Sequence, residues 1–176
     1  MTIENEHSYC VGDNIIVHNC LTSTQTGVHY PMASLINDIY TIKKNIGGEC
    51  KIVADGGIRC YSDIIKALAL GADYVMSGFL FSKAATGEEK IGDAIEYYGM
   101  STKRAQKEMG NTVLKTSEGK FLSLTKEYTL SGWVENFDAY LRSAMSYCDS
   151  RTLDEFREKS VKQVVSEETI KNVNNK

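Results

Sequence analysis

Several features that mark other classes of protein are absent from this 176-residue sequence. It has no run of about 18 apolar residues, so we expect no segment to span a membrane. Its N-terminus is acidic and polar, so we expect no signal peptide. Lysine and arginine form no cluster and the formal net charge is -3, which argues against a surface that binds nucleic acid.

A Cys-x-x-Cys pair is also missing, and the number of cysteines, five, is odd. Neither property is typical of a secreted protein that is stabilised by disulfides. We therefore expect a cytoplasmic protein whose thiols stay reduced. The cysteines are Cys10, Cys20, Cys50, Cys60 and Cys148.

The length fits one globular domain of the usual size, about 150 residues, and 42% of the residues are apolar, which is enough for a hydrophobic core. The first 19 residues differ from the rest of the chain. Short apolar runs at 9–11 and 15–17 flank a Gly12-Asp13-Asn14 turn, a pattern that predicts a β-hairpin.

From residue 31 onwards the pattern alternates between helix and strand. Pro31 is expected at the first position of a helix over about 32–45, which ends at Gly47-Gly48. A strand over 50–54, expected to be buried on both faces, is followed by a helix with Ser62 as its N-cap and by a strand over 74–76. This alternation predicts a parallel sheet in an α/β domain.

Residues 82–131 show weak periodicity and are rich in Gly, Lys, Glu, Thr and Ser. Such a stretch is expected to form a long loop with a functional or mobile role. Helices are predicted over about 133–145 and 149–159, followed by a polar tail at 166–176.

The tripeptide His18-Asn19-Cys20 has the residue types that are needed to break and remake a peptide bond. An Asn side-chain amide can attack its own backbone carbonyl and cleave the following bond, and a neighbouring His can assist by proton transfer. A Cys thiol after the Asn can accept an acyl group. For three residues alone a surface segment is the better interpretation, so the assignment depends on the residues before them.

Residues 2–19 resemble the C-terminal end of an intein. The resemblance implies that His7 and His18 assist the cyclisation of Asn19 and that Cys20 is the first residue after the intein. The remaining intein motifs belong upstream. The chain is therefore either the C-terminal partner of a split intein or a truncated reading frame.

Cys20 also opens a second pattern. It lies in a polar loop before a helix, with Thr22 two residues later, and a thiolate forms more readily in such a position; a buried structural cysteine is the commoner alternative. Asp55 ends one predicted strand and Ser77-Gly78 ends the next. A carboxylate there could bind sugar hydroxyls, and backbone amides could hold a phosphate.

These positions, in this order, resemble the IMP dehydrogenase/GMP reductase family over residues 20–165. The resemblance implies an α/β fold, the C-terminal portion of a TIM barrel with a mobile flap at 82–131, behind an intein β-hairpin at 1–19. The matching segments are Cys20-Leu21-Thr22, Thr26-Gly27-Val28-His29-Tyr30-Pro31, Ala54-Asp55-Gly56-Gly57, Gly71-Ala72-Asp73-Tyr74-Val75-Met76-Ser77-Gly78, Tyr98-Gly99-Met100-Ser101, Ser117-Glu118-Gly119-Lys120 and Leu141-Arg142-Ser143-Ala144-Met145.

In that family a cysteine attacks C2 of a purine nucleotide. The resemblance implies that Cys20 is the nucleophile and that Thr22 and the flap residue Glu118 handle the proton and the ammonia. Lys115 stands at a cofactor contact where the reductase has an arginine. The substrate-binding residues that it implies are Asp55 for the ribose, Gly78 and Tyr98 for the phosphate, Met100 and Ser101 for the base, and beside them Gly57, Ser77 and Gly99.

The residues around Tyr30-Pro31 and Tyr98 resemble those of GMP reductase, and residues 102–117 lack the Arg-Tyr pair of IMP dehydrogenase. The chain is therefore expected to be the C-terminal fragment of an enzyme resembling GMP reductase, which converts GMP and NADPH to IMP and ammonia, matured by splicing in trans. The alternatives are IMP dehydrogenase, which uses IMP and NAD, a protein-splicing module, and a truncated inactive fragment.

The resemblances also imply partners. These are GMP or IMP, an upstream chain that carries the N-intein and the N-terminal half of the barrel, and, after splicing, a homotetramer with a monovalent cation such as K+. No metal-ligating side chains are expected. The isolated fragment is expected to be inactive and poorly soluble or partly folded, because its parallel strands lack neighbours.

Overall fold

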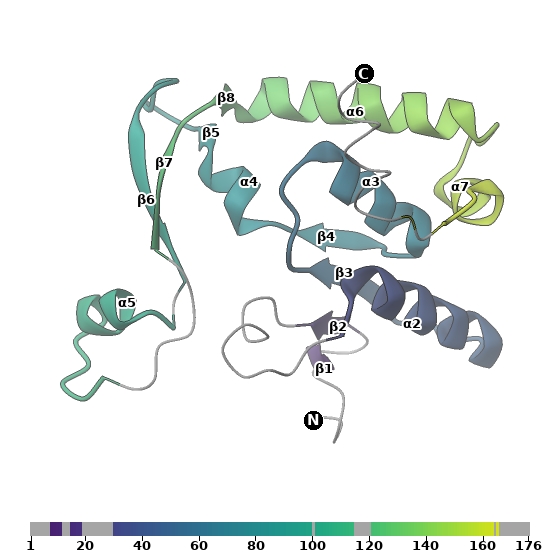
Figure 1. Cartoon of the computed structure of the whole chain (residues 1–176), viewed down its shortest axis with the longest axis horizontal. Helices are drawn as coiled ribbons and strands as arrows, with labels where there is room; N and C mark the ends of the chain where they lie inside the picture. Colours follow the sequence, from purple (N-terminus) through teal and green to yellow (C-terminus); the bar gives the residue numbers. More distant parts are fainter. Residues whose placement is uncertain are drawn as a thin grey trace.

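The computed structural model describes residues 8–11, 15–18, 30–99, 101–114, 121–163 and 165, the first two ranges by their backbone. Four strands form the main sheet, in the order β1 (Ser8–Val11), β2 (Ile15–His18), β3 (Lys51–Asp55) and β4 (Tyr74–Met76) (Figure 1). β1 and β2 form an antiparallel hairpin, and β2, β3 and β4 run parallel. The predicted hairpin strands and the predicted parallel sheet are both confirmed.

The helix before β3 agrees with the sequence pattern. α2 (Met32–Ile46) ends where Gly47 adopts a left-handed φ of 66°, and the Gly47 N–H donates to the last carbonyls of the helix. Pro31 precedes the helix instead of being its first residue.

The helix between β3 and β4, α3 (Tyr61–Leu70), starts differently from the prediction. Cys60 is its N-cap, and Ser62 lies inside the first turn. The Asp63 carboxylate accepts the backbone N–H of Arg59 at 3.1 Å, and the Asp63 N–H donates to the Cys60 carbonyl at 3.2 Å. The two bonds satisfy backbone groups at the start of the helix, which begins without a side-chain cap from its N-cap residue.

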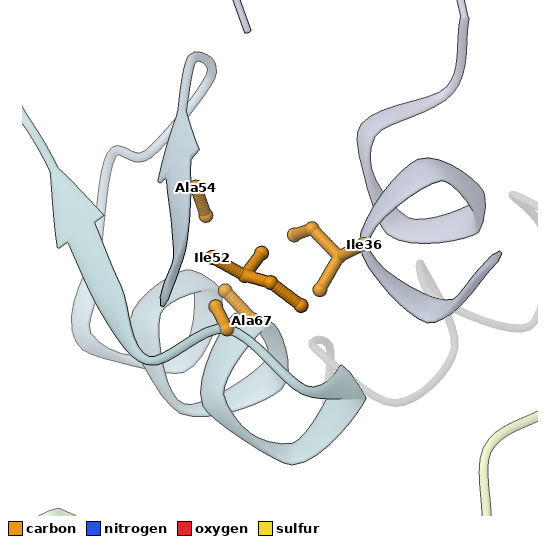
Figure 2. Close-up of a cluster of buried hydrophobic side chains, with 5 residues drawn as sticks. Ile36, Ile52, Ala54 and Ala67 are labelled. Atoms are coloured by element: carbon orange, nitrogen blue, oxygen red, sulfur yellow. The ribbon is translucent and has the colours of Figure 1, made fainter. Parts of the chain in front are cut away.

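The main core lies between β3 and the two helices. Ile52 packs with Ile36 of α2 and Ala67 of α3, so both helices cover the same face of the strand (Figure 2). Val53 and Asp55, on the opposite face of β3, are only half-buried. The prediction that this strand is buried on both faces is wrong, because the described elements cover one face.

The described residues of 78–129 form short helices and strands instead of the long loop predicted over 82–131. β6 and β7 pair antiparallel, with Ala94 opposite Thr125 and Tyr98 opposite Phe121. This pairing joins residues roughly 20 to 30 positions apart, so no local turn signal marks it in the sequence. The elements are α4 (Gly78–Ser82), β5 (Ala84–Ala85), β6 (Ala94–Tyr98), α5 (Lys103–Glu108), β7 (Phe121–Thr125) and β8 (Tyr128–Thr129).

We call β6, α5 and β7 the arm, because they project away from the main sheet (Figure 1). Lys126, a buried residue at the root of the arm, donates to the Ala84 carbonyl at 2.9 Å and pairs with Glu89 at 3.0 Å. Lys83 pairs with Glu127 at 2.7 Å beside it. These contacts attach the arm to the segment that follows α4.

Two helices complete the chain, α6 (Leu130–Tyr147) and α7 (Leu153–Lys159). α6 begins earlier than predicted because the Thr129 hydroxyl caps it, accepting the Gly132 N–H at 3.2 Å. α7 begins later than predicted, after Thr152, whose hydroxyl accepts the Glu155 N–H at 3.2 Å. Among the described residues, no helix is both long enough and apolar enough to cross a membrane.

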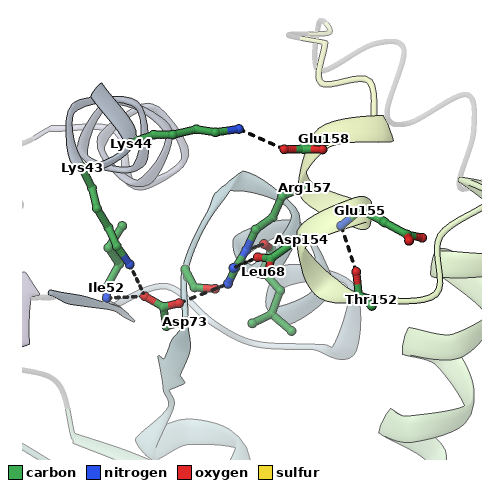
Figure 3. A network of polar contacts seen from close by, with 11 residues as sticks. Lys43, Lys44, Ile52, Leu68, Asp73, Thr152, Asp154, Glu155, Arg157 and Glu158 are labelled. Carbon is green, nitrogen blue, oxygen red and sulfur yellow. Dashed lines mark hydrogen bonds and ion pairs between the residues drawn. The ribbon is translucent and has the colours of Figure 1, made fainter. Parts of the chain in front are cut away.

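A polar network fastens α7 to the sheet (Figure 3). The Asp73 carboxylate accepts the Ile52 N–H at 2.9 Å and pairs with Lys43 of α2 at 3.1 Å and with Arg157 of α7 at 3.4 Å. Arg157 also donates to the Ala72 carbonyl at 2.7 Å. One carboxylate therefore joins two helices to the starts of β3 and β4.

Replacement of Asp73 by Asn should lower the free energy of unfolding by about 2 kcal/mol, because the largely buried Arg157 and Lys43 lose their anionic partner. Urea unfolding measures the effect. The matched control is Asp138→Asn, which breaks an exposed pair with Arg142 on α6 and should cost less than about 0.5 kcal/mol. Equal effects of the two substitutions would contradict the assigned role of Asp73.

The pH dependence of unfolding gives a second test. Burial alone would raise the pKa of Asp73, but the Ile52 N–H and the cations Lys43 and Arg157 outweigh it and lower the pKa below its usual value. A carboxylate whose pKa is lowered by folding stabilises the fold above its unfolded pKa, about 3.9, and loses that stabilisation as the pH falls through the folded value. Stability should therefore decline below about pH 4, and less steeply in Asp73→Asn.

Candidate active site at the carboxyl ends of the parallel strands

A cavity with a volume of about 620 Å³ opens on the exposed face of the sheet. It lies where β4 passes into α4, and its lining is mostly apolar. One lining residue comes from β3, and the others come from the end of β4 and from α4. The lining residues are Val53, Val75, Met76, Ser77, Gly78, Phe81 and Ser82.

Asp55 is the last residue of β3 and pairs with Met76 in the strand register, so its carboxylate belongs to the same end of the sheet as the cavity. Burial raises the pKa of the Asp55 carboxyl. Gly56 and Gly57 follow with φ of 125° and 70°, a backbone that favours glycine and turns the chain sharply after the strand. The half-buried carboxylate can accept hydrogen bonds from a polar ligand.

Ser77 is buried, and its hydroxyl is used within the protein. It donates to the Ile58 carbonyl at 3.1 Å and accepts the Leu80 N–H at 3.3 Å. These bonds tie the loop after β3 to the first turn of α4. A ligand at this position would therefore be held by the backbone of residues 77–78 more readily than by the serine side chain.

Gly78 lies directly beneath a tyrosine of the arm. A Cβ atom at Gly78 would lie 3.0 Å from the Tyr97 hydroxyl oxygen. Phe79 packs edge-on against the Tyr97 ring, with centroids 6.2 Å apart. Tyr97 was not predicted from the sequence; it belongs to β6 and lies against Gly78, one of the residues that line the cavity.

Tyr98, the residue that the resemblance named, lies in a different environment. Its hydroxyl donates to Glu108 of α5 at 2.6 Å, and its ring stacks on Phe121 with centroids 6.0 Å apart. The Arg104 guanidinium lies 5.1 Å from the Tyr98 ring centroid. Successive residues of a strand point to opposite faces, so the alternation along β6 was the signal that could have separated Tyr97 from Tyr98.

Gly99 and Ser101 shape the turn that opens α5. The Gly99 carbonyl accepts the Thr102 hydroxyl at 2.7 Å, and the Ser101 carbonyl accepts the Gln106 side-chain amide at 2.9 Å. The turn therefore belongs to the arm, so Gly99 and Ser101 could contact a ligand only from the arm side of the site.

The structure brings together only part of the predicted site. Asp55, Gly57, Ser77 and Gly78 gather at the carboxyl ends of β3 and β4, with Tyr97 above them. His18 belongs to β2 by its backbone. The remaining predicted residues lie outside the described residues: His7, Asn19, Cys20, Thr22, Met100, Lys115 and Glu118.

Within the described ranges, no group of three or more His, Cys, Asp or Glu side chains could hold a metal ion. The thiols of Cys50, Cys60 and Cys148 are free.

Comparison with known proteins gives one consistent match. The family model described as "IMP dehydrogenase / GMP reductase domain" matches residues 18–175. The GMP reductase of Vibrio cholerae is 31% identical over 148 residues, which cover 80% of this chain and 42% of the relative. The GMP reductase of Caenorhabditis elegans is 30% identical over 160 residues, which cover 85% of this chain and 43% of the relative. The chain thus spans about two-fifths of the length of these curated relatives.

A solved structure shares the fold. A crystal structure of GMP reductase from Trypanosoma brucei in complex with guanosine 5'-monophosphate superposes with a TM-score of 0.74 and 24% identity. The match covers 88% of this chain and 33% of that chain. It supports the predicted partial barrel.

Replacement of Ser77 by Ala should lower the free energy of unfolding by about 1–2 kcal/mol, because the buried Leu80 N–H and Ile58 carbonyl both lose a partner. Chemical unfolding measures the change. Ser82→Ala is the matched control on the same segment, since its hydroxyl donates only to the Gly78 carbonyl, at 2.7 Å, and should cost less than about 0.5 kcal/mol. A Ser77 variant as stable as the Ser82 variant would show that the serine does not hold this corner.

Proposed function

The chain belongs to the IMP dehydrogenase/GMP reductase family, and we propose that it forms the C-terminal part of an NADPH-dependent GMP reductase. The observation that carries the proposal is the cavity at the carboxyl ends of β3 and β4, which is lined by Ser77 and Gly78. Asp55 lies opposite Met76 at the same end of the sheet, and Tyr97 lies against Gly78. Ligands of parallel α/β barrels bind at this end of the sheet. The reaction is GMP + NADPH + 2 H+ to IMP + NADP+ + NH4+.

The described residues are suited to the ribose phosphate of a nucleotide. Ribose hydroxyls would donate to the Asp55 carboxylate, which is half-buried and carries a raised pKa. The phosphate would lie against the Ser77–Gly78 backbone amides, and the Tyr97 hydroxyl, which lies 3.0 Å from where a Cβ at Gly78 would be, would donate to it. In this proposal Tyr98 acts by holding the arm, and Gly57, Gly99, Met100 and Ser101 keep their assigned places around the substrate.

The reaction at the base depends on residues outside the described ranges. The Cys20 sulfur would bond to C2 of GMP, the amino group would leave C2 as ammonia, and the carbon–sulfur bond would break when C2 is reduced to give IMP. Thr22 and Glu118 would move the protons that this exchange requires. Balance requires one hydride, which is the chemistry that NADPH supplies when bound.

The described residues do not by themselves fit NADPH. Its phosphates require cationic or amide donors, and no lysine or arginine is among the described residues that line the cavity. Lys115, or the part of the enzyme contributed by another chain, would have to hold them.

The proposed enzyme needs an upstream chain, because this chain spans about two-fifths of its relatives. Tyr74, Met76 and Phe81 lie on the open side of the sheet and remain 46% to 59% exposed. In a complete barrel that side faces the other strands and is filled by side chains. After assembly the proposed enzyme is a homotetramer with a monovalent cation, as the family resemblance implies.

Splicing in trans would join the two parts. The upstream acyl group would first pass to the Cys20 sulfur as a thioester, which releases the N-intein. The Asn19 side-chain nitrogen would then attack its own backbone carbonyl, the bond to Cys20 would break, and residues 1–19 would leave as a succinimide, assisted by His7 and His18. The freed amino group of Cys20 then takes the upstream acyl group from the Cys20 sulfur. The thiol is thereby restored, so the same cysteine can act first as acceptor and later as nucleophile.

Mixing this chain with the candidate upstream chain, one that carries the N-intein and the N-terminal half of the barrel, should yield a single ligated product that lacks residues 1–19. Intact-protein mass spectrometry detects it. The product should then oxidise NADPH in the presence of GMP and release ammonia. The GMP reductase relatives favour this assay over IMP with NAD, which tests the dehydrogenase alternative.

Two variants separate the steps. Asn19→Ala should stop the release of residues 1–19 because no side-chain amide remains to cyclise. Cys20→Ser can still accept an acyl group through its hydroxyl but should lose reductase activity, because an alcohol is a far weaker nucleophile than a thiolate. Retained reductase activity in the ligated Cys20→Ser product would refute the assignment of the nucleophile. No ligation with any upstream chain would favour the truncated fragment.

A further inference from the structure

The strand that precedes Cys20 is built into the same sheet as the family-matched strands. Ile15 pairs with Lys51, Ile16 with Ile52 and Val17 with Val53, all in parallel register. The family match begins only at residue 18. Residues that belong to the proposed intein segment therefore occupy the place next to β3, with β1 on their outer side.

The backbone bonds of β3 show which of its groups face this strand. The Ile52 N–H donates to the Asp73 carboxylate at 2.9 Å, and the Ile52 carbonyl accepts the Asp73 N–H at 2.8 Å. Ile52 therefore faces β4. Backbone groups alternate in direction along a strand, so Lys51 and Val53 face β2, and Ile16 lies between them in the register.

Splicing would replace β2 by another strand, and the new strand would be joined to the chain at the same residue, Cys20. Cys20 stays with this chain, and β2 ends two residues before it, at His18. A segment ligated to Cys20 leaves from the same place at the same end of the sheet. To enter the sheet next to β3 it must run parallel to β3, as β2 does, and each strand of a closed barrel has a neighbour on both sides.

We propose that β2 is a temporary edge partner of β3, which is displaced on ligation by the strand that the upstream chain contributes directly before Cys20. The displacement rests on the proposed splicing; the pairing of β2 with β3 does not. Until ligation, β2 satisfies the Lys51 and Val53 backbone groups, which would otherwise form an open edge able to pair with other chains. The β3 edge is thus the docking surface for a parallel strand of the upstream chain.

Residue-resolved amide hydrogen exchange on the full chain tests the pairing. In the unmodified chain the Lys51 and Val53 amides should exchange slowly. In this parallel register the Ile16 N–H donates to the Lys51 carbonyl, and the Ile16 carbonyl accepts the Val53 N–H. Ile16→Pro removes the first bond and disrupts the pairing of β2 with β3. Both amides should then exchange roughly tenfold faster or more, while the Ile52 and Ala54 amides, which face β4, stay protected. This internal comparison separates the loss of β2 from global unfolding.

Val161→Pro, at an 86% exposed position outside the sheet, is the control and should leave all four amides unchanged. Fast exchange of Lys51 and Val53 in the unmodified chain, or no response to Ile16→Pro, would overturn the pairing. In the ligated product, which lacks β2, both amides should be protected again. Free exchange there would overturn the displacement. Failure of ligation would overturn it together with the splicing route, and the exchange data on the unmodified chain would still decide the pairing.

Discussion

The carboxylate of Asp73 is the contact on which the rest of the fold depends. It accepts the Ile52 N–H near the start of strand β3, and it forms ion pairs with Lys43 of α2 and Arg157 of α7. Because Asp73 also immediately precedes β4, these bonds set β3 and β4 in one register. That register brings Asp55 level with Met76, so the carboxylate and the Ser77–Gly78 backbone meet at the opposite end of the strands. The contacts of Asp73 thus determine the geometry of the candidate site, although they lie at the other end of the strands.

The second constraint is that one face of the sheet is closed and the other is open. α2 and α3 pack on Ile52, whereas Val53, Tyr74 and Met76 face the cavity or solvent. Exposed apolar side chains on a parallel sheet are unusual, because such sheets are normally covered on both faces. The open face is therefore the physical reason to infer further strands from another chain. It is also the reason that the predicted two-sided burial of β3 did not hold.

The sequence predicted the elements that depend on local patterns. Helical spacing gave α2, α3 and α6, and the turn at Gly47 ended α2 as expected. The strands of the arm were not predicted, because Ala94 pairs with Thr125, which is distant in the sequence, and no local pattern encodes such a pairing. The choice between Tyr97 and Tyr98 depended on which face of β6 meets Gly78, a tertiary fact. Likewise, Ser77 was predicted beside the substrate, but its hydroxyl is bonded to the Ile58 carbonyl and the Leu80 N–H, which are tertiary contacts. The predicted nucleophile Cys20 lies outside the described residues, so its placement stays a prediction.

In the proposed function the site is divided between two chains because of the position of Cys20. Asp55, Ser77, Gly78 and Tyr97 all belong to this chain and are held by contacts within it, so the proposed ribose-phosphate side would form before any ligation. The proposed nucleophile, Cys20, differs, because it follows whichever strand is joined before it. While β2 is that strand, the loop begins from a hairpin whose outer side is occupied by β1. Ligation would replace the hairpin by a strand with barrel neighbours on both sides, and the loop would then be anchored as in a closed barrel. In the proposed function, binding of the nucleotide's ribose phosphate and reactivity at its base therefore arise at different stages of assembly.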